Sequence, residues 1–264
     1  MPRRVQQGFS VVELTIVALV LLLIAGSAFV MWSKQRTDKA LNGTHVARQA
    51  EDQGSVSAKP QLERWPVAID DLNSDTKLAG DVYMDDLVLL DQSNNLAEQP
   101  VVEFGRSAHG AQAPNNSIDF LTKPDAPVYA AAKGYVLDVT PAQAAGDYNV
   151  QISMAKTTVS EWMVTYTHLT AVTIKKGDTV QPGDRIGTAA PYGNGQPFSI
   201  VGLAAAYKGK PYCPSGLIAP KAVGAMKEQF LLLTKAWEAQ SVNGGAYNEP
   251  AWTQLGCVAD SLKI

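Results

Sequence analysis

The sequence predicts an α+β fold, in which a long N-terminal helix precedes a mainly antiparallel β domain that ends in a C-terminal helix. Residues 14–32 carry no charged side chain, which is typical of a helix that crosses a membrane. After residue 101, short alternating segments separated by Gly and Pro favour an antiparallel sheet. Residues 220–240 begin with a Pro and place apolar side chains at near-helical spacing, which predicts a helix. We therefore divide the chain into five segments: 1–8, 9–50, 51–100, 101–220 and 221–264.

The composition is that of a chain large enough for one globular domain with appendages. It has 264 residues, of which 46% are hydrophobic and 18% are charged, and its formal net charge is -3. Binding to nucleic-acid phosphates needs clustered Lys and Arg, whereas the basic residues here are scattered apart from Arg3 and Arg4. We therefore expect no nucleic-acid partner.

The apolar run at residues 14–32 is long enough to span a bilayer, because nineteen helical residues cover about 28 Å. Basic residues flank it on both sides, so the positive-inside rule leaves its orientation open. Residues 33–48 are polar, with Ala, Leu and Val at loose helical spacing. The helix is therefore expected to continue outside the membrane, to about residue 50.

A short motif begins this helix. Residues 8–14 read GFSVVEL, so a basic leader ends at Gly8 and an acid, Glu13, lies in the apolar segment. This pattern resembles a type IV prepilin or pseudopilin. The resemblance implies that a prepilin peptidase cuts between Gly8 and Phe9 and methylates the new amine of Phe9. A carboxylate in an apolar helix costs about 3 kcal/mol at the bilayer centre unless it is paired, and in pilins this acid is taken to pair with the terminal amine of a neighbouring subunit.

On this hypothesis residues 1–8 are a leader peptide, residues 9–50 are a membrane and assembly helix, and Glu13 is the assembly residue. The implied partners are other pilin subunits, the prepilin peptidase and the inner membrane, from which the protein would enter a filament or the periplasm. Two other interpretations stay open. A secretory signal would need a small-residue cleavage site, for which residues 25–28 (AGSA) could serve, and an uncleaved anchor would carry a stray acid.

Residues 51–100 are predicted to form a linker and a short α/β region. Residues 52–60 (DQGSVSAKP) are small and polar and end in Pro, which is typical of a linker. Residues 86–91 (DLVLLD) are consistent with a short strand. No residue in this segment indicates chemistry, and His45 upstream is interpreted as a solvated helix residue.

The next segment contains six short motifs in a recognisable order. They are NSIDF at 116–120, APVYAAAKGYV at 126–136, VTYTHL at 164–169, a hairpin at 174–187, YKGKP at 207–211 and PSGL at 214–217. Together they resemble the lysostaphin-like zinc endopeptidases, which cut peptidoglycan cross-bridges. The resemblance implies that residues 101–220 form a largely antiparallel sheet with a groove over one face. The hairpin also resembles biotinyl-type carrier domains, but no Lys in a Met-Lys-Met setting is present.

That family holds zinc with a His, an Asp and a second His, and leaves one position for the attacking water. The resemblance implies that His109 and Asp119 supply the first two ligands. It also implies that His168 is the His that orients or deprotonates the water. The second zinc His should belong to a His-x-His pair on a late strand, with both side chains on one face.

No register of the late strand supplies this second His. The matching residues 193–200 read GNGQPFSI, and none of the chain's three histidines follows His168. Two ligands make a poor zinc site, so we predict a retained fold without hydrolase chemistry or a cofactor, with His109 and Asp119 as residual metal candidates. Without zinc, we expect His168 and Asp119 to hydrogen-bond each other or the neighbouring backbone. The registers considered place these pairs at the two His positions: Gly195 and Pro197, Phe198 and Ile200, or Pro197 and Ser199.

Cys213 and Cys257 lie in the last quarter of the chain, and an isolated Cys pair in an exported chain is interpreted first as a disulfide. Closing that loop would stabilise the fold by about 4 kcal/mol on the chain-entropy model. Two buried free thiols are the alternative. A disulfide would tie the tail after residue 240 to the β domain.

These features predict a minor type IV pilin or pseudopilin whose catalytically inactive peptidase-like head serves adhesion or partner binding, with peptidoglycan or a surface ligand as its target. The large head favours a minor subunit over a major one. Two alternatives stay open: a membrane-anchored zinc endopeptidase that cuts peptidoglycan cross-links, and a non-catalytic activator of a cell-wall hydrolase. Zinc would be a cofactor only in the endopeptidase.

Overall fold

The computed structural model describes most of the chain that follows residue 54. All described residues belong to the second of two compact units, Gly54–Ile264, whereas the first unit is Met1–Gln53. Within the described part, no helix combines the length and the apolar character that a membrane crossing needs. The described residues are 55, 57–85, 99–106, 113–142, 146–157, 159–192, 197–240, 247 and 249–262. Several predicted features lie outside them: Gly8, Phe9, Glu13, His45, His109 and the strand at 86–91.

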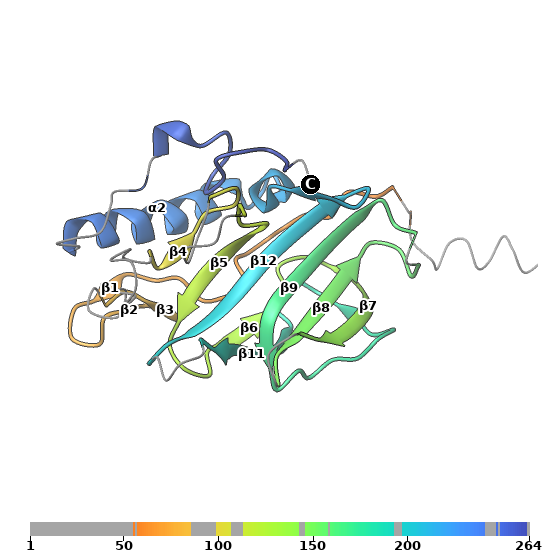
Figure 1. Ribbon diagram of the computed structural model, residues 1–264, viewed down its shortest axis with the longest axis horizontal. Coiled ribbons are helices and arrows are strands. Elements are labelled where there is room, and N and C mark those ends of the chain that lie inside the picture. The colour runs from red at the N-terminus through yellow and green to blue at the C-terminus, as the bar shows by residue number, and fades with distance from the viewer. Residues whose placement is uncertain are drawn as a thin grey trace, which may run out of the picture. The chain divides into compact units, whose positions relative to one another are not determined.

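One sheet organises the described residues, and every pairing between its strands is antiparallel, as predicted. Its main path is β1-β2-β3-β5-β12-β11-β9-β8-β7-β10, and β12 also pairs directly with β9. Figure 1 shows β5, β12, β9, β8 and β7 side by side. The strands are β1 Leu72–Asn73, β2 Leu78–Ala79, β3 Val82–Tyr83, β4 Val101–Val102, β5 Ser117–Thr122, β6 Pro127–Tyr129, β7 Gly134–Pro141, β8 Tyr148–Ser153, β9 Trp162–Thr170, β10 Thr179–Val180, β11 Arg185–Pro191, β12 Ser199–Tyr207 and β13 Lys210–Tyr212.

Alternation along the central strands separates a core face from a second face, because successive side chains of a strand point to opposite sides. The pairs Leu203 with Ile118 and Leu203 with Tyr166 lie in register across β5, β12 and β9. These three side chains are fully buried. The residues that alternate with them are smaller or polar, and this second face is called the open face below.

The α2 helix (Val223–Gln240) covers part of the core, and Figure 1 shows it beside the sheet at the β4 side. Its buried residues recur every three or four positions, as an amphipathic helix requires. Trp65 connects the helix to the sheet, because its ring lies 5.3 Å from Phe230 and 5.6 Å from Phe120 between ring centroids. The predicted C-terminal helix is therefore confirmed, but it begins at Val223 rather than at Pro220.

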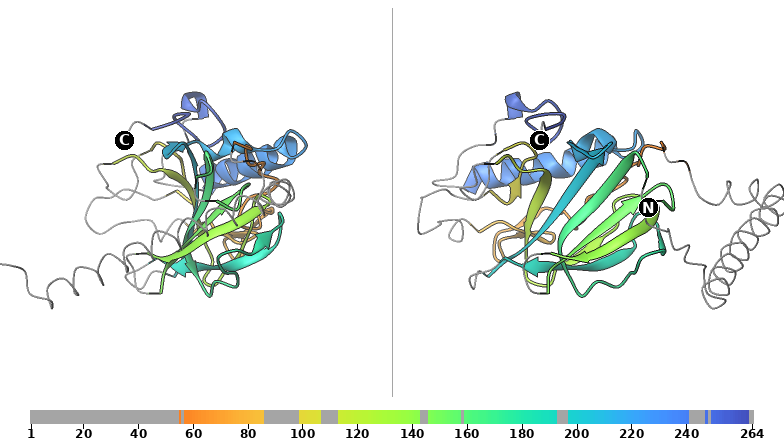
Figure 2. Two further views of the ribbon diagram at one scale, coloured as in Figure 1. Left: turned by 90° about the vertical axis from the view of Figure 1, so that its right-hand side faces the viewer. Right: turned by 45° about the vertical axis from the view of Figure 1, so that its right-hand side comes forward.

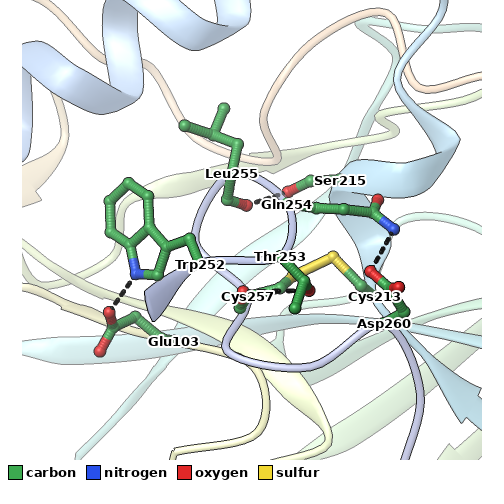
Figure 3. Close-up of a disulfide and its surroundings, with 9 residues drawn as sticks. All are labelled: Glu103, Cys213, Ser215, Trp252, Thr253, Gln254, Leu255, Cys257 and Asp260. Carbon is green, nitrogen blue, oxygen red and sulfur yellow. Dashed lines mark hydrogen bonds between the residues drawn. A yellow bond between two sulfur atoms is a disulfide. The ribbon is translucent and has the colours of Figure 1, made fainter. Parts of the chain in front are cut away.

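The tail after α2 is tied to the β domain by a disulfide between Cys213 and Cys257, which confirms the predicted pairing (Figure 3). Both cysteines are completely buried. The Trp252 indole N–H adds a second tie by donating to the buried Glu103 carboxylate at 2.5 Å. Arg106 balances that carboxylate with an ion pair of 2.8 Å. Figure 2 shows the tail and the helix near the upper end of the sheet in both views.

Candidate functional site

The candidate site lies where three strands meet on the open face. Gly202 of β12 stands directly opposite Asp119 of β5 on one side and Thr167 of β9 on the other. Side chains of residues paired in register point to the same face of a sheet. Asp119 and Thr167 therefore flank a position that carries no side chain of its own.

Asp119 is 6% exposed, and two residues that precede it in the chain provide hydrogen-bond donors to its carboxylate. The Ser117 hydroxyl lies 2.5 Å from Asp119 Oδ1, and the Asn115 amide donates to Asp119 Oδ2 at 2.9 Å. Hydrogen bonds to an ionised acceptor are about twice as strong as neutral ones. Both oxygens of this nearly buried carboxylate are thus already engaged within the protein.

Gly202 is required by the close approach of these side chains. A Cβ atom built on Gly202 would overlap both Thr167 Oγ1 and Asp119 Oδ1. Because these are the polar ends of the two flanking side chains, they occupy the space that any residue larger than glycine would need. Asp119, Thr167 and Gly202 therefore form a closed polar cluster across three strands.

His168 lies beside this cluster, but the structure gives it a different partner. Its Nδ1 atom is 2.9 Å from Oδ2 of Asp147, so His168 hydrogen-bonds a buried carboxylate other than that of Asp119. The His168 side chain is 43% exposed, whereas that of Asp147 is 8% exposed. The second oxygen of Asp147, Oδ1, is buried and has no hydrogen-bond partner among the described residues.

A β-bulge explains how the imidazole reaches this position. Between the pair Tyr148–Leu169 and the pair Val150–Tyr166, β9 advances by three residues while β8 advances by two. His168 lies within this stretch and has a φ of 60°, in the left-handed region. A bulge interrupts alternation and re-aims one side chain, and such features are over-represented near functional sites. The Asp147 carboxylate then holds Nδ1, which leaves Nε2 as the imidazole nitrogen available to a ligand.

Among the described residues, the side chains that surround Asp119 are not typical zinc ligands. Zinc in proteins takes Cys, His, Asp or Glu ligands, usually at least three. The side chains around Asp119 offer hydroxyl and amide groups, and Gly202 offers nothing. In the part of the chain that the structure describes, no three His, Cys, Asp or Glu side chains gather as a metal site would require. The predicted first ligand, His109, lies outside these residues, so its role stays a prediction.

The structure pairs Asp119 with a position of the late strand that none of the considered registers used. All three predicted registers used residues 195–200, whereas the position opposite Asp119 is Gly202. Because side chains alternate along a strand, Ile200 lies on the same face as Gly202, with one residue between them. The Lys208-Gly209 pair is the sequence signal that could have located this position. It forms the turn between β12 and β13, where both residues have a positive φ. Asp147 had no such signal, because its partner is twenty-one residues away.

Residues 113–206 match the model of peptidase family M23. The match confirms that this part of the chain is an M23-type, lysostaphin-like domain. The comparison with curated proteins found no match.

Several solved structures resemble the M23-type domain. A zinc-containing peptidase from Vibrio cholerae has 21% sequence identity and a TM-score of 0.39, covering 61% of this chain and 40% of its own. Lysostaphin has 18% identity and a TM-score of 0.33, with 49% of each chain covered. The catalytic domain of EnpA from Enterococcus faecalis, in an A109H variant, has 20% identity and a TM-score of 0.34, covering 42% of this chain and 85% of its own. The chain thus spans less than half of the first two proteins.

Proposed function

We propose that the M23-type domain is a non-catalytic module of the cell envelope, which binds peptidoglycan peptides over its open face and assists a wall hydrolase without cutting. The observation that carries this proposal is Gly202, which stands in register opposite Asp119 and offers no side chain as a further ligand. Asp119 instead accepts hydrogen bonds from Ser117 and Asn115. A cluster that is already satisfied internally has little to gain from binding a metal.

The open face suits an extended peptide. Gly202 is followed at alternate positions of β12 by Ala204, which pairs with Ser117 on β5 and with Thr165 on β9. Thr165 pairs in turn with Gln151 on β8. Small residues let a peptide backbone come close, and hydroxyl and amide groups can satisfy its N–H and C=O groups. The His168 side chain, which is 43% exposed, would provide one further polar contact through Nε2.

Metal content tests the proposal directly. The full-length chain, purified in detergent and loaded with equimolar zinc, should retain far less than one tightly held zinc after dialysis. It should also leave cross-linked peptidoglycan fragments uncut. One zinc per chain, lost on His109→Ala together with hydrolysis, would instead support the membrane-anchored endopeptidase. The observation that favours this rival is the His168 imidazole, which Asp147 orients as a general base would need.

Peptide binding is the second test. Soluble peptidoglycan stem peptides should bind the full-length chain, and Thr165→Trp should weaken that binding by filling the open face. A variant that keeps the unfolding midpoint and still binds as the natural chain does would contradict the proposal. Co-purification of a peptidoglycan amidase with the natural chain, and its loss with Thr165→Trp, would support the activator role.

The motif at residues 8–14 supports a further proposal: residues 9–50 act as a pilin-like assembly helix that presents the M23-type domain on a filament. Mass spectrometry of the mature N-terminus tests this. A chain that begins at methylated Phe9 would support it, whereas an intact Met1 or a start after Ala28 would contradict it. Glu13→Gln should abolish incorporation into filaments, because the neutral side chain no longer pairs with an amine.

A further inference from the structure

Three aromatic side chains meet at a place remote in sequence from the cluster at Asp119. Trp162 begins β9, Tyr207 ends β12, and Tyr212 ends β13. Strands β9 and β12 lie side by side in Figure 1. The centroid of the Trp162 ring lies 4.5 Å from that of Tyr207 and 5.1 Å from that of Tyr212. Antiparallel pairing of Tyr207 with Trp162 brings these rings together. They form one continuous aromatic surface.

Lysines surround this surface. The Lys59 ammonium lies 5.5 Å from the Trp162 ring centroid and 5.8 Å from that of Tyr212. The Lys208 ammonium lies 5.2 Å from the Tyr207 centroid and 3.2 Å from Glu161. Both lysines are exposed, and Glu161 pairs with Lys208, so these three groups together carry a net positive charge. The three rings with Lys59 and Lys208 are called the aromatic–lysine patch.

The rings of the patch are only partly exposed. Trp162 and Tyr212 are half-buried against the core, and Tyr207 is 36% exposed. Insertion into a bilayer needs apolar side chains that reach the acyl boundary, which half-buried rings do not do. Aromatic faces carry a negative quadrupole, so the C–H face of a sugar ring packs on them. A neighbouring ammonium group attracts an anion.

We propose that the aromatic–lysine patch binds cell-wall glycan strands from which the stem peptides have been removed, that is, a polysaccharide of N-acetylated amino sugars whose lactyl groups end in free carboxylates. The sugar rings lie on Tyr207 and Trp162, and Lys59 and Lys208 attract the carboxylates. This inference rests on the proposed cell-wall role. It adds a contact with the glycan to the peptide contact on the open face.

The experiment uses the full-length chain in detergent and glycan strands from which the peptides have been removed by amidase. Tyr207→Ala should weaken binding by about three- to tenfold, as expected for the loss of one aromatic contact. Lys59→Gln should weaken binding at low salt and less at high salt, because screening already removes its contribution there. Tyr135→Ala is the matched control, since Lys156 lies 5.0 Å over that ring outside the patch.

Binding of all three variants equal to that of the natural chain would overturn the proposal, as would equal weakening by Tyr135→Ala and Tyr207→Ala. Binding to anionic phospholipid vesicles that depends on Tyr207, with none to the glycan, would assign the patch to membrane instead and also overturn it. The stem-peptide test separates the two proposals. Glycan binding that fails in Tyr207→Ala while stem-peptide binding persists supports the patch independently of the open face.

Discussion

The two faces of strands β5, β12 and β9 are built from alternate residues of the same segments, yet they have opposite properties. On the core face, Phe120, Leu203 and Tyr166 are fully buried. On the open face, Asp119, Gly202 and Thr167 stand in register and are small or polar. Large apolar side chains stabilise the sheet from one side. The other side carries Asp119, whose carboxylate accepts hydrogen bonds from Ser117 and Asn115.

The core face should dominate stability. Phe120→Ala removes a fully buried ring that contacts Trp65, and we expect the free energy of unfolding to fall by about 3–5 kcal/mol. Denaturant unfolding of the full-length chain measures this change. Thr165→Ala on the open face is the matched control and should cost less than about 1 kcal/mol. Equal losses in the two variants would break the distinction between the faces.

The hydroxyl of Tyr166 makes the core face sensitive to high pH. Burial raises the pKa of Tyr166 to about 12, although the backbone N–H of Ala131 donates to its oxygen. The pKa of Tyr166 in the folded protein lies above its unfolded value of 10.0, so the protonated hydroxyl contributes to the free energy of unfolding. That contribution is complete below pH 10. It is lost as the pH rises through about 12, by roughly 3 kcal/mol in total. Unfolding followed from pH 9 to 12 measures it.

The control for this titration is Tyr166→Phe, which should flatten the pH dependence while lowering stability at pH 7, since the Ala131 N–H loses its acceptor. Burial also raises the pKa of Tyr247, so some dependence should persist in the variant. An unchanged slope in Tyr166→Phe would show that the core face does not carry this effect.

On the open face, the largest effect should come from Gly202. Gly202→Ala forces a Cβ against Thr167 and Asp119 and should destabilise the protein by about 1–3 kcal/mol, as overpacking does. Gly224→Ala in α2 is the matched control, because nothing lies within 4 Å of its added Cβ. That control should be neutral or stabilise by up to about 1 kcal/mol. A harmless Gly202→Ala would mean that the polar cluster is not closed.

Asp119→Asn should have the smallest effect, about 1 kcal/mol, because the amide keeps one acceptor for the donors on Ser117 and Asn115. Asp70→Asn, at an exposed position, should change the free energy of unfolding by less than about 0.5 kcal/mol. If the cluster has a structural role alone, binding of stem peptides should fall no more than stability does. A selective loss of peptide binding would show that Asp119 itself contacts the ligand.

Much of the fold follows from local sequence. Alternating segments predicted an antiparallel sheet, apolar spacing predicted the C-terminal helix, and the two cysteines predicted their disulfide. The six motifs predicted the lysostaphin-like domain, which the M23 match confirms. These features depend on residues close in the chain or on a count of two cysteines. The pilin-like hypothesis for residues 9–50 stays a prediction.

The sequence by itself determined that no histidine follows His168, and hence that a second late zinc ligand of that type is absent. It could not determine that Gly202 is the position opposite Asp119, nor that Asp147 holds His168, nor that Trp162 meets Tyr207 and Tyr212. Period-two alternation assigns each residue to a face, but it does not say which residues face one another across strands. Only long-range pairing in the folded sheet decides that register.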